Sequence, residues 1–473
     1  MRRWARQTAR LHNELAELAD VRDPRWWLVA GGAALPWPPR AEYLQTDAEP
    51  AGDTFIGHLT SSAPTTSLVD ALARAHAARA ALRELDGALP QQPLAVTIRR
   101  SHGGAFVVPS RLDVAAFAIG DRVYSHRLAP RFEDETGELV PAGDVPFVTV
   151  TFGDEPLATA RHAHRRGWRT NGVAEGPWLG LTHAAGVAIV STCHIVVDGY
   201  GHAWLAARID ERYRELIANT PPTFAAATIA QPASGVAGAI SPVREVAEAI
   251  SPLREVTGAV PPLREVAGAV PLALGWRRLS NAAPKVVRFA YALGQVLHRV
   301  AGRPDAPFSP TFQIPVARGD KTDPFRLKRR VTPALASVRF EHGRPEPYEA
   351  FAARTRDSLA REANGNGLTS RLLDAARAMP GPLAWKRRVV GPARRAWLAP
   401  FADVLGGRAC LSKIALDIPM PPSIAVSSPS IANDELGGCV VTIVQDQTHA
   451  IITWSGTGRV GDPALLDELL ALV

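Results

Sequence analysis

The sequence has few of the residues and segments that define specialised protein classes. Its three cysteines, Cys193, Cys410 and Cys439, form no CxxC pair and no Cys/His spacing typical of zinc sites. A small, odd number of cysteines argues for reduced thiols and against a disulfide framework. No run reaches the roughly 18 apolar residues that a membrane span needs. The N-terminal segment lacks the continuous apolar core of a signal peptide. These absences predict a cytoplasmic protein.

The composition that remains is that of a globular chain. Hydrophobic residues make up 46% of the 473 residues and charged residues 21%. This length exceeds one ordinary core, so we expect two domains or two pseudo-equivalent halves. The net charge of +7 suits an acidic partner such as the phosphates of CoA, nucleic acid or an anionic membrane surface. Because no zinc-finger, RNP-like or helix-turn-helix signature is present, we expect no nucleic acid.

The hydrophobic periodicity alternates between strand and helix along both halves of the chain. A capping pattern and helical spacing predict a helix from Leu68 to Gly87. Further helices are expected from Gly201 and over 284–300, 348–363 and 464–472. Strands are expected over 94–98, 106–108, 145–152, 178–181, 187–197, 312–316, 334–340, 409–416, 438–444 and 450–454. This mixture predicts an α/β layered fold.

A tandem repeat separates the two halves. Three decapeptides follow one another, beginning Ser241-Pro242-Val243-Arg244-Glu245-Val246, Ser251-Pro252-Leu253-Arg254-Glu255-Val256 and Pro261-Pro262-Leu263-Arg264-Glu265-Val266. Three copies are too few for a solenoid, and proline in each copy limits helix length. We therefore divide the chain into an N-terminal half (1–218), a linker or surface insertion (219–275) and a C-terminal half (276–473). A docking segment is the alternative for the repeats.

The segment His194-Ile195-Val196-Val197-Asp198-Gly199 carries the strongest chemical signal. It lies where a nearly continuous apolar strand ends and an amphipathic helix follows. A neutral imidazole at His194 can take a proton from a hydroxyl, amine or thiol. Asp198 can fix the local geometry by pairing with an arginine, or can orient the ring. Gly199 allows a backbone conformation closed to other residues and leaves room for a substrate.

Three other readings compete with a general base at His194. His194, Asp198 and His202 recur every four residues, and two histidines with a carboxylate can bind iron. A metal site of this kind requires one continuous helix through the three residues, and we expect Gly199 and Gly201 to break such a helix. A Cys193–His194 nucleophilic pair is disfavoured because adjacent strand residues point to opposite faces. The last reading is a hydrogen-bonded core histidine.

The run Ser191-Thr192-Cys193-His194-Ile195-Val196-Val197-Asp198-Gly199 resembles the HxxxDG signature of the chloramphenicol acetyltransferase-like superfamily. That superfamily includes condensation domains of peptide synthetases and wax ester synthase/diacylglycerol acyltransferases. The run Gln313-Ile314-Pro315-Val316-Ala317-Arg318 is similar to a strand of the wax ester synthase branch. The resemblance implies two similar halves, each a mixed sheet with flanking helices, which meet at a central tunnel.

The resemblance also implies roles for individual residues. His194 would be the base, and Asp198 would hold the site in shape through an arginine. A serine of the C-terminal half would donate to the oxyanion, and Ser412 is our candidate. The chain departs from the family at Cys193, where many members have a first histidine, and at Lys413, where the wax ester branch often has asparagine. It also lacks the DFGWG motif of the condensation and plant-type branches.

The resemblance implies an acyltransferase with acyl-CoA as co-substrate, a small-molecule or lipid acceptor and no resident cofactor. The alternative is a catalytically degenerate member of the same fold that binds a lipid or a carrier protein. A segment with clustered arginine and tryptophan at 385–401 suits peripheral contact with a membrane. The competing interpretation of this segment is a solvated surface loop.

Overall fold

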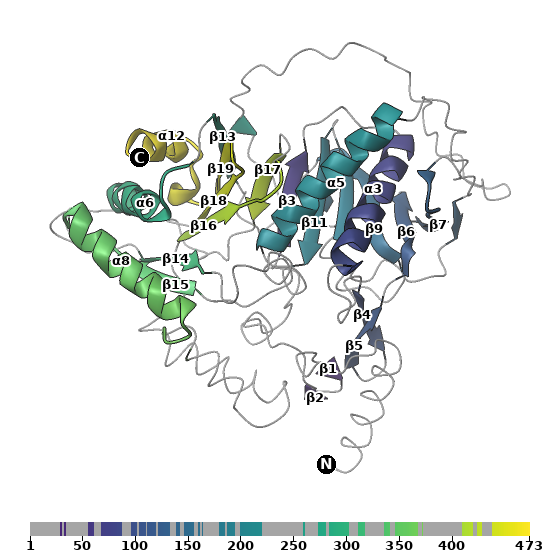
Figure 1. The fold of residues 1–473 in the computed structure, drawn as a ribbon, viewed down its shortest axis with the longest axis horizontal. Coiled ribbons are helices and arrows are strands. Elements are labelled where there is room, and N and C mark those ends of the chain that lie inside the picture. Colours follow the sequence, from purple (N-terminus) through teal and green to yellow (C-terminus); the bar gives the residue numbers. More distant parts are fainter. Residues whose placement is uncertain are drawn as a thin grey trace.

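The computed structural model contains two large mixed sheets with helices packed against them (Figure 1). The structure describes residues 29–30, 33–34, 55–60, 68–87, 96–101, 104–109, 111–119, 122–132, 139–141, 146–155, 159–160, 163, 179–184, 187–193, 199–219, 259–260, 273–280, 283–301, 311–316, 335–340, 346–367, 371, 409–419, 423–427 and 438–473. The repeat segment is described only at 259–260, and the basic segment at 385–401 lies outside the described residues.

The first sheet belongs mainly to the N-terminal half and has eight strands in the order β17-β3-β11-β10-β9-β6-β7-β8. Its strands are β3 (Phe55–Thr60), β6 (Arg111–Ile119), β7 (Arg122–Arg127), β8 (Val140–Pro141), β9 (Pro146–Gly153), β10 (Leu179–Ala184), β11 (Val187–Cys193) and β17 (Ser423–Ser427). The helices α3 (Leu68–Gly87) and α5 (Gly199–Asn219) lie together across one face of this sheet (Figure 1).

The second sheet is formed by the C-terminal half and has seven strands in the order β12-β13-β19-β18-β16-β14-β15. Its strands are β12 (Ala259–Val260), β13 (Ala273–Leu279), β14 (Thr311–Pro315), β15 (Leu335–Arg339), β16 (Ala409–Ala415), β18 (Cys439–Gln445) and β19 (Ala450–Gly456). The helices of this half are α6 (Val286–Ala301), α8 (Tyr348–Ala363) and α12 (Leu465–Ala471), with the short 3₁₀ helix η3 (Arg459–Gly461) before α12.

The two sheets repeat one topology. The strands β3-β11-β10-β9-β6-β7 and β13-β19-β18-β16-β14-β15 both pair antiparallel, antiparallel, parallel, parallel and antiparallel in that order. In each half a helix follows the first of these strands and another follows the second: α3 and α5 in one, α6 and α12 in the other. The expected pair of pseudo-equivalent halves, each a mixed sheet with flanking helices, is therefore confirmed. The tunnel between them stays a prediction, as do the domain boundaries.

Each sheet also receives a strand at the same edge. β17 leaves the C-terminal half and pairs antiparallel with β3, so it extends the sheet of the other half. β12 lies in the repeat region and pairs antiparallel with β13, the strand that corresponds to β3. A separate small sheet has the order β2-β1-β5-β4, from β1 (Val29–Ala30), β2 (Ala33–Ala34), β4 (Val96–Ser101) and β5 (Gly104–Pro109).

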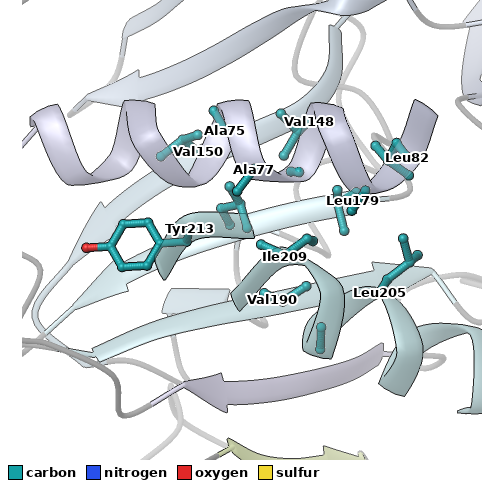
Figure 2. Packing of buried hydrophobic residues seen from close by; sticks show 14 of the residues in the cluster. Ala75, Ala77, Leu82, Val148, Val150, Leu179, Val190, Leu205, Ile209 and Tyr213 are labelled. Carbon is teal, nitrogen blue, oxygen red and sulfur yellow. The ribbon is translucent and has the colours of Figure 1, made fainter. Parts of the chain in front are cut away.

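The N-terminal core lies between the first sheet and the pair α3 and α5. Figure 2 shows Leu82 of α3 and Ile209 of α5 directed toward Val148 and Leu179 of the sheet. α3 contributes a series of buried alanines, whose small side chains let the two helices approach closely; they are Ala71, Ala73, Ala75, Ala77, Ala78 and Ala81. Burial of each larger aliphatic side chain contributes about 1.5–3 kcal/mol.

The C-terminal core lies on the opposite side of its own sheet from the N-terminal half. Phe289 of α6, Phe351 of α8 and Leu466 of α12 pack there against Leu411 and Trp454. In contrast, Ile414, Leu416, Val444 and Ile451 belong to the core that contains α3 and α5. The other face of the C-terminal sheet is thus packed against the N-terminal half, which places α5 next to both sheets.

Candidate functional site

The strand that leads to the predicted motif is central and buried. β11 pairs with β3 on one side and β10 on the other, and Thr192 stands opposite Ile56 and Leu179 in these ladders. Residues 188 to 192 are all buried. The apolar run 187–197 was expected to be covered on both faces, and this is confirmed for residues 188 to 192. The last residue of β11 is Cys193, directly before His194.

The helix that follows the motif begins at Gly199. The expectation that Gly199 and Gly201 break the helix was wrong, because both lie in its first turn and Gly201 is buried there. Tertiary packing outweighs the low helix propensity of glycine at this position. Gly199 is also not among the described glycines with positive φ, which are Gly365 and Gly458.

The glycine at 199 instead allows a close approach of the other half. A Cβ atom built on Gly199 would lie 3.4 Å from Cδ1 of Ile414 in β16. Tyr200 makes a second link, because its hydroxyl donates to Oδ1 of Asp417 at 3.2 Å. The first turn of α5 therefore contacts the end of β16, so the residues next to the motif meet the C-terminal sheet.

A buried hydrogen bond joins the two elements that flank the motif. Oγ1 of Thr192 lies 2.7 Å from Nδ1 of His202. Both residues are fully buried at 0% exposure. Thr192 is near the end of β11 and His202 is in the first turn of α5. This bond therefore links the strand before residues 194–198 to the helix after them.

Ser412 lies on the face of β16 that is turned toward the N-terminal half. Side chains alternate between the faces of a strand, so Ser412 shares a face with Ile414. Ile414 packs in the core of α3 and α5, whereas Leu411 packs in the core of the C-terminal half. Two residues of extended strand span about 7 Å. Ser412 is thus one alternation away from the contact between Ile414 and Gly199.

Two neighbours of Ser412 in β16, Lys413 and Cys410, do not supply a charge or a nucleophile beside it. Lys413 points to the opposite face, where Nζ donates to the carbonyls of Ala283 and Pro284 at 3.0 and 2.9 Å. Burial lowers the pKa of Lys413. The departure from the family at this position therefore adds no charge to the face of Ser412. Burial raises the pKa of the Cys410 thiol to about 12, so Cys410 is not a thiolate nucleophile near neutral pH.

Ser412 continues into a row of hydroxyls across the sheet. Ser412 stands beside Thr442 in the pairing of β16 with β18, and Thr442 stands opposite Thr453 in the pairing with β19. Thr442 and Thr453 are buried, and Oγ1 of Thr453 has no hydrogen-bond partner within the described structure. We did not identify the two threonines from the sequence, although the hydroxyl residues in 438–444 and 450–454 share one strand face with Ser412.

The middle of α5 is anchored to α3 by buried charges. Asp210 and Arg74 are both fully buried, with 3.8 Å between Oδ1 and Nη1. Oδ2 of Asp210 also accepts from Arg214, and Asp70 accepts from the hydroxyl of Tyr213. Burial lowers the pKa of Arg74, while the nearby acidic groups and Tyr213 oppose that shift. These contacts fix α5 along its length against α3.

The structure brings some of the predicted site residues together and does not describe others. Gly199 and Ser412 come from different halves; Gly199 lies next to Ile414, and Ser412 shares a face of β16 with Ile414. His194 and Asp198 lie outside the described residues, so their roles stay predictions. Of the metal alternative, only His202 is described. Within the part of the chain that the structure describes, no group of three or more His, Cys, Asp or Glu could hold a metal ion.

Comparisons with known proteins found likeness in structure alone. No family model matches the chain, and no curated protein sequence does. A variant of the starter condensation domain of rhizomide synthetase RzmA in complex with C8-CoA and Leu-SNAC is 12% identical, with a TM-score of 0.41, 89% of this chain covered and 87% of that chain. The first condensation domain of the calcium-dependent antibiotic synthetase, in complex with a substrate analogue, is 13% identical, with a TM-score of 0.40 and coverages of 89% and 91%.

None of the described helices is long and apolar enough to cross a membrane.

Proposed function

We propose that this chain transfers an acyl group from acyl-CoA to a hydroxyl or amine acceptor, with His194 as general base and Ser412 as oxyanion donor. One observation supports the proposal most strongly. The helix that begins directly after HxxxDG contacts β16 at Ile414, and Ser412 shares the face of β16 on which Ile414 lies. A base from one half and an oxyanion donor from the other can then act on a single thioester.

The transfer would proceed by direct attack of the acceptor. Neutral His194 takes the proton from the acceptor as its oxygen or nitrogen bonds to the thioester carbonyl carbon. The carbonyl oxygen becomes an oxyanion, and the Ser412 hydroxyl donates to it. The intermediate then collapses, the carbon–sulfur bond breaks, and the CoA thiolate receives the proton from the His194 imidazolium. A positioned base contributes about 10²–10⁴-fold and one oxyanion donor about 10²–10³-fold.

The remaining residues of the motif would have supporting roles. Asp198 holds the segment in shape by pairing with an arginine. Gly199 lies at the start of α5 beside Ile414, where an added Cβ atom would lie 3.4 Å from Cδ1. Cys410 does not compete as a nucleophile, because burial raises the pKa of its thiol to about 12.

The donor and acceptor classes are proposed from the net charge of the chain and from one basic, aromatic segment. Acyl-CoA is the donor we propose, as co-substrate and without a resident cofactor. The net charge of +7 suits its phosphates. A lipid acceptor is the finer proposal, supported by the arginine- and tryptophan-rich segment at 385–401.

The test is release of CoA thiol from a panel of acyl-CoA chain lengths, with and without hydroxyl and amine acceptors. We expect release to depend on an acceptor and to fall by about 10²–10⁴-fold in His194→Ala. We expect a smaller loss of about 10²–10³-fold in Ser412→Ala. If the full protein releases no thiol with any pair, or if His194→Ala keeps the activity of the native protein, the proposal is wrong.

A further inference from the structure

The hydrogen bond between Thr192 and His202 has no part in the proposed transfer chemistry, yet it joins the two ends of the segment that performs it. Thr192 precedes His194 by two positions, and His202 follows Asp198 by four. The donor–acceptor distance is 2.7 Å, and both residues are fully buried. A hydrogen bond between two fully buried groups is stronger than one at the surface, because the local dielectric is low and solvent does not reach either group.

We infer that Thr192 and His202 are positioning residues, whose hydrogen bond sets the placement of His194 and Asp198. This inference rests on the proposed function. It also gives His202 a role other than that of a metal ligand, since its Nδ1 is engaged by a threonine hydroxyl.

Both ends of this link are themselves held in rigid elements. Thr192 is fixed in a central strand, with ladder partners on both sides. His202 lies in a helix that contacts β16 at its start and is anchored to α3 by Asp210 farther along. The Thr192–His202 bond connects these two elements directly at the motif. The contacts of Gly199 and Tyr200 hold the first turn of α5 to β16, whereas the Thr192–His202 bond links that turn to β11.

The bond therefore determines how far the end of β11 lies from the first turn of α5. The residues between them must span that separation, and a change in it moves His194 relative to Ser412. A misplacement of about 1 Å at a reacting group can cost on the order of 10²-fold in rate. Loss of the bond should thus lower the rate of the chemical step and leave substrate affinity nearly unchanged.

The experiment compares isosteric variants with a matched control. Thr192→Val removes the hydroxyl and keeps the shape, whereas Thr192→Ser keeps a hydroxyl. The control is Thr149→Val in β9, because Thr149 is also a buried threonine of this sheet and its Oγ1 has no hydrogen-bond partner within the described structure. His202→Leu removes the other partner, so the test does not depend on one variant folding.

We expect kcat to fall about 10- to 100-fold in Thr192→Val and in His202→Leu, with KM for acyl-CoA nearly unchanged. Thr192→Ser should recover most of the rate, and Thr149→Val should match the native protein. The double variant Thr192→Val/His202→Leu should be no slower than the slower single variant, because each single change already breaks the Thr192–His202 bond.

Two outcomes would overturn the inference while leaving the proposed function intact. One is a kcat for Thr192→Val equal to that of Thr149→Val while His194→Ala remains inactive. The other is a double variant whose loss equals the product of the two single losses. Failure of the proposed function is seen separately, as a lack of acceptor-dependent thiol release in the native protein.

Discussion

The two halves share one topology but differ at the connection that matters for chemistry. In the N-terminal half, β11 is followed by His194 and then by α5; in the C-terminal half, β19 is followed by Thr457 and then by η3 and α12. We term these the N-terminal junction (194–198) and the C-terminal junction (457–464). The N-terminal junction carries the proposed base, whereas the C-terminal junction carries no histidine.

The C-terminal junction is closed by backbone packing. A Cβ atom on Gly461 would lie 2.4 Å from the carbonyl carbon of Gly456, and one on Gly456 would lie 2.7 Å from the carbonyl oxygen of Gly438. Nε1 of Trp454 donates to the carbonyl of Val460 at 3.1 Å. Here the backbone segments pack closely against one another. The equivalent connection is thus a close-packed structural element in the C-terminal half, whereas in the N-terminal half it carries the proposed base.

The largest stability difference between the halves should appear at their ion pairs. Asp210→Ala removes a fully buried carboxylate 3.8 Å from the buried Arg74, so we expect the free energy of unfolding to fall by about 3–5 kcal/mol. Asp467 of α12 pairs with Arg277 at 2.6 Å, but it is 56% exposed. Asp467→Ala should therefore cost only about 0–1 kcal/mol. Urea denaturation of both variants measures the difference, and equal losses would contradict the account.

Gly461 in the C-terminal junction and Gly199, directly after the N-terminal junction, should respond differently to one added methyl group. Gly461→Ala forces a contact with rigid backbone, and we expect a loss of about 1–3 kcal/mol. Gly199→Ala meets only the end of the Ile414 side chain at 3.4 Å and gains helix propensity. Its unfolding free energy should stay within about 1 kcal/mol of the native value. Thermal melts distinguish the two, and an equal or larger loss in Gly199→Ala would contradict this expectation.

The smallest expected effect concerns the hydroxyl row beside Ser412. Thr453→Val replaces a buried hydroxyl that has no partner in the described structure, so stability should stay the same or rise by about 1 kcal/mol. Thr192→Val removes a hydroxyl that is bonded to His202, and it should lose about 1–3 kcal/mol. Calorimetry of the pair tests this, and destabilisation of Thr453→Val by the same amount would contradict it.

Much of the fold could be predicted because the signals were local. The helix expected over 348–363 is α8 with the same bounds, and the helix from Leu68 to Gly87 is α3. The strand expected over 409–416 is β16, which ends one residue earlier. In these segments the periodicity and the residues at the ends agree with the tertiary structure.

The elements that the sequence analysis missed depend on distant partners. β17 is five residues long, and its partner β3 is more than 300 positions away, so no local pattern indicates the pairing. β6 is rich in alanine, and β13 contains two adjacent arginines, which weakens the strand pattern in each. The Thr192–His202 bond was missed for a similar reason. It follows from the way α5 packs on β11 and not from spacing along the chain.

The most direct test of the account compares the first residue of each junction in one assay. Single-turnover transfer from a saturating acyl-CoA is measured for the native protein, for His194→Ala and for Thr457→Val, with folding of each checked by circular dichroism. The account predicts a loss of about 10²–10⁴-fold for His194→Ala and a native rate for Thr457→Val. A native rate for His194→Ala in a folded protein would contradict it.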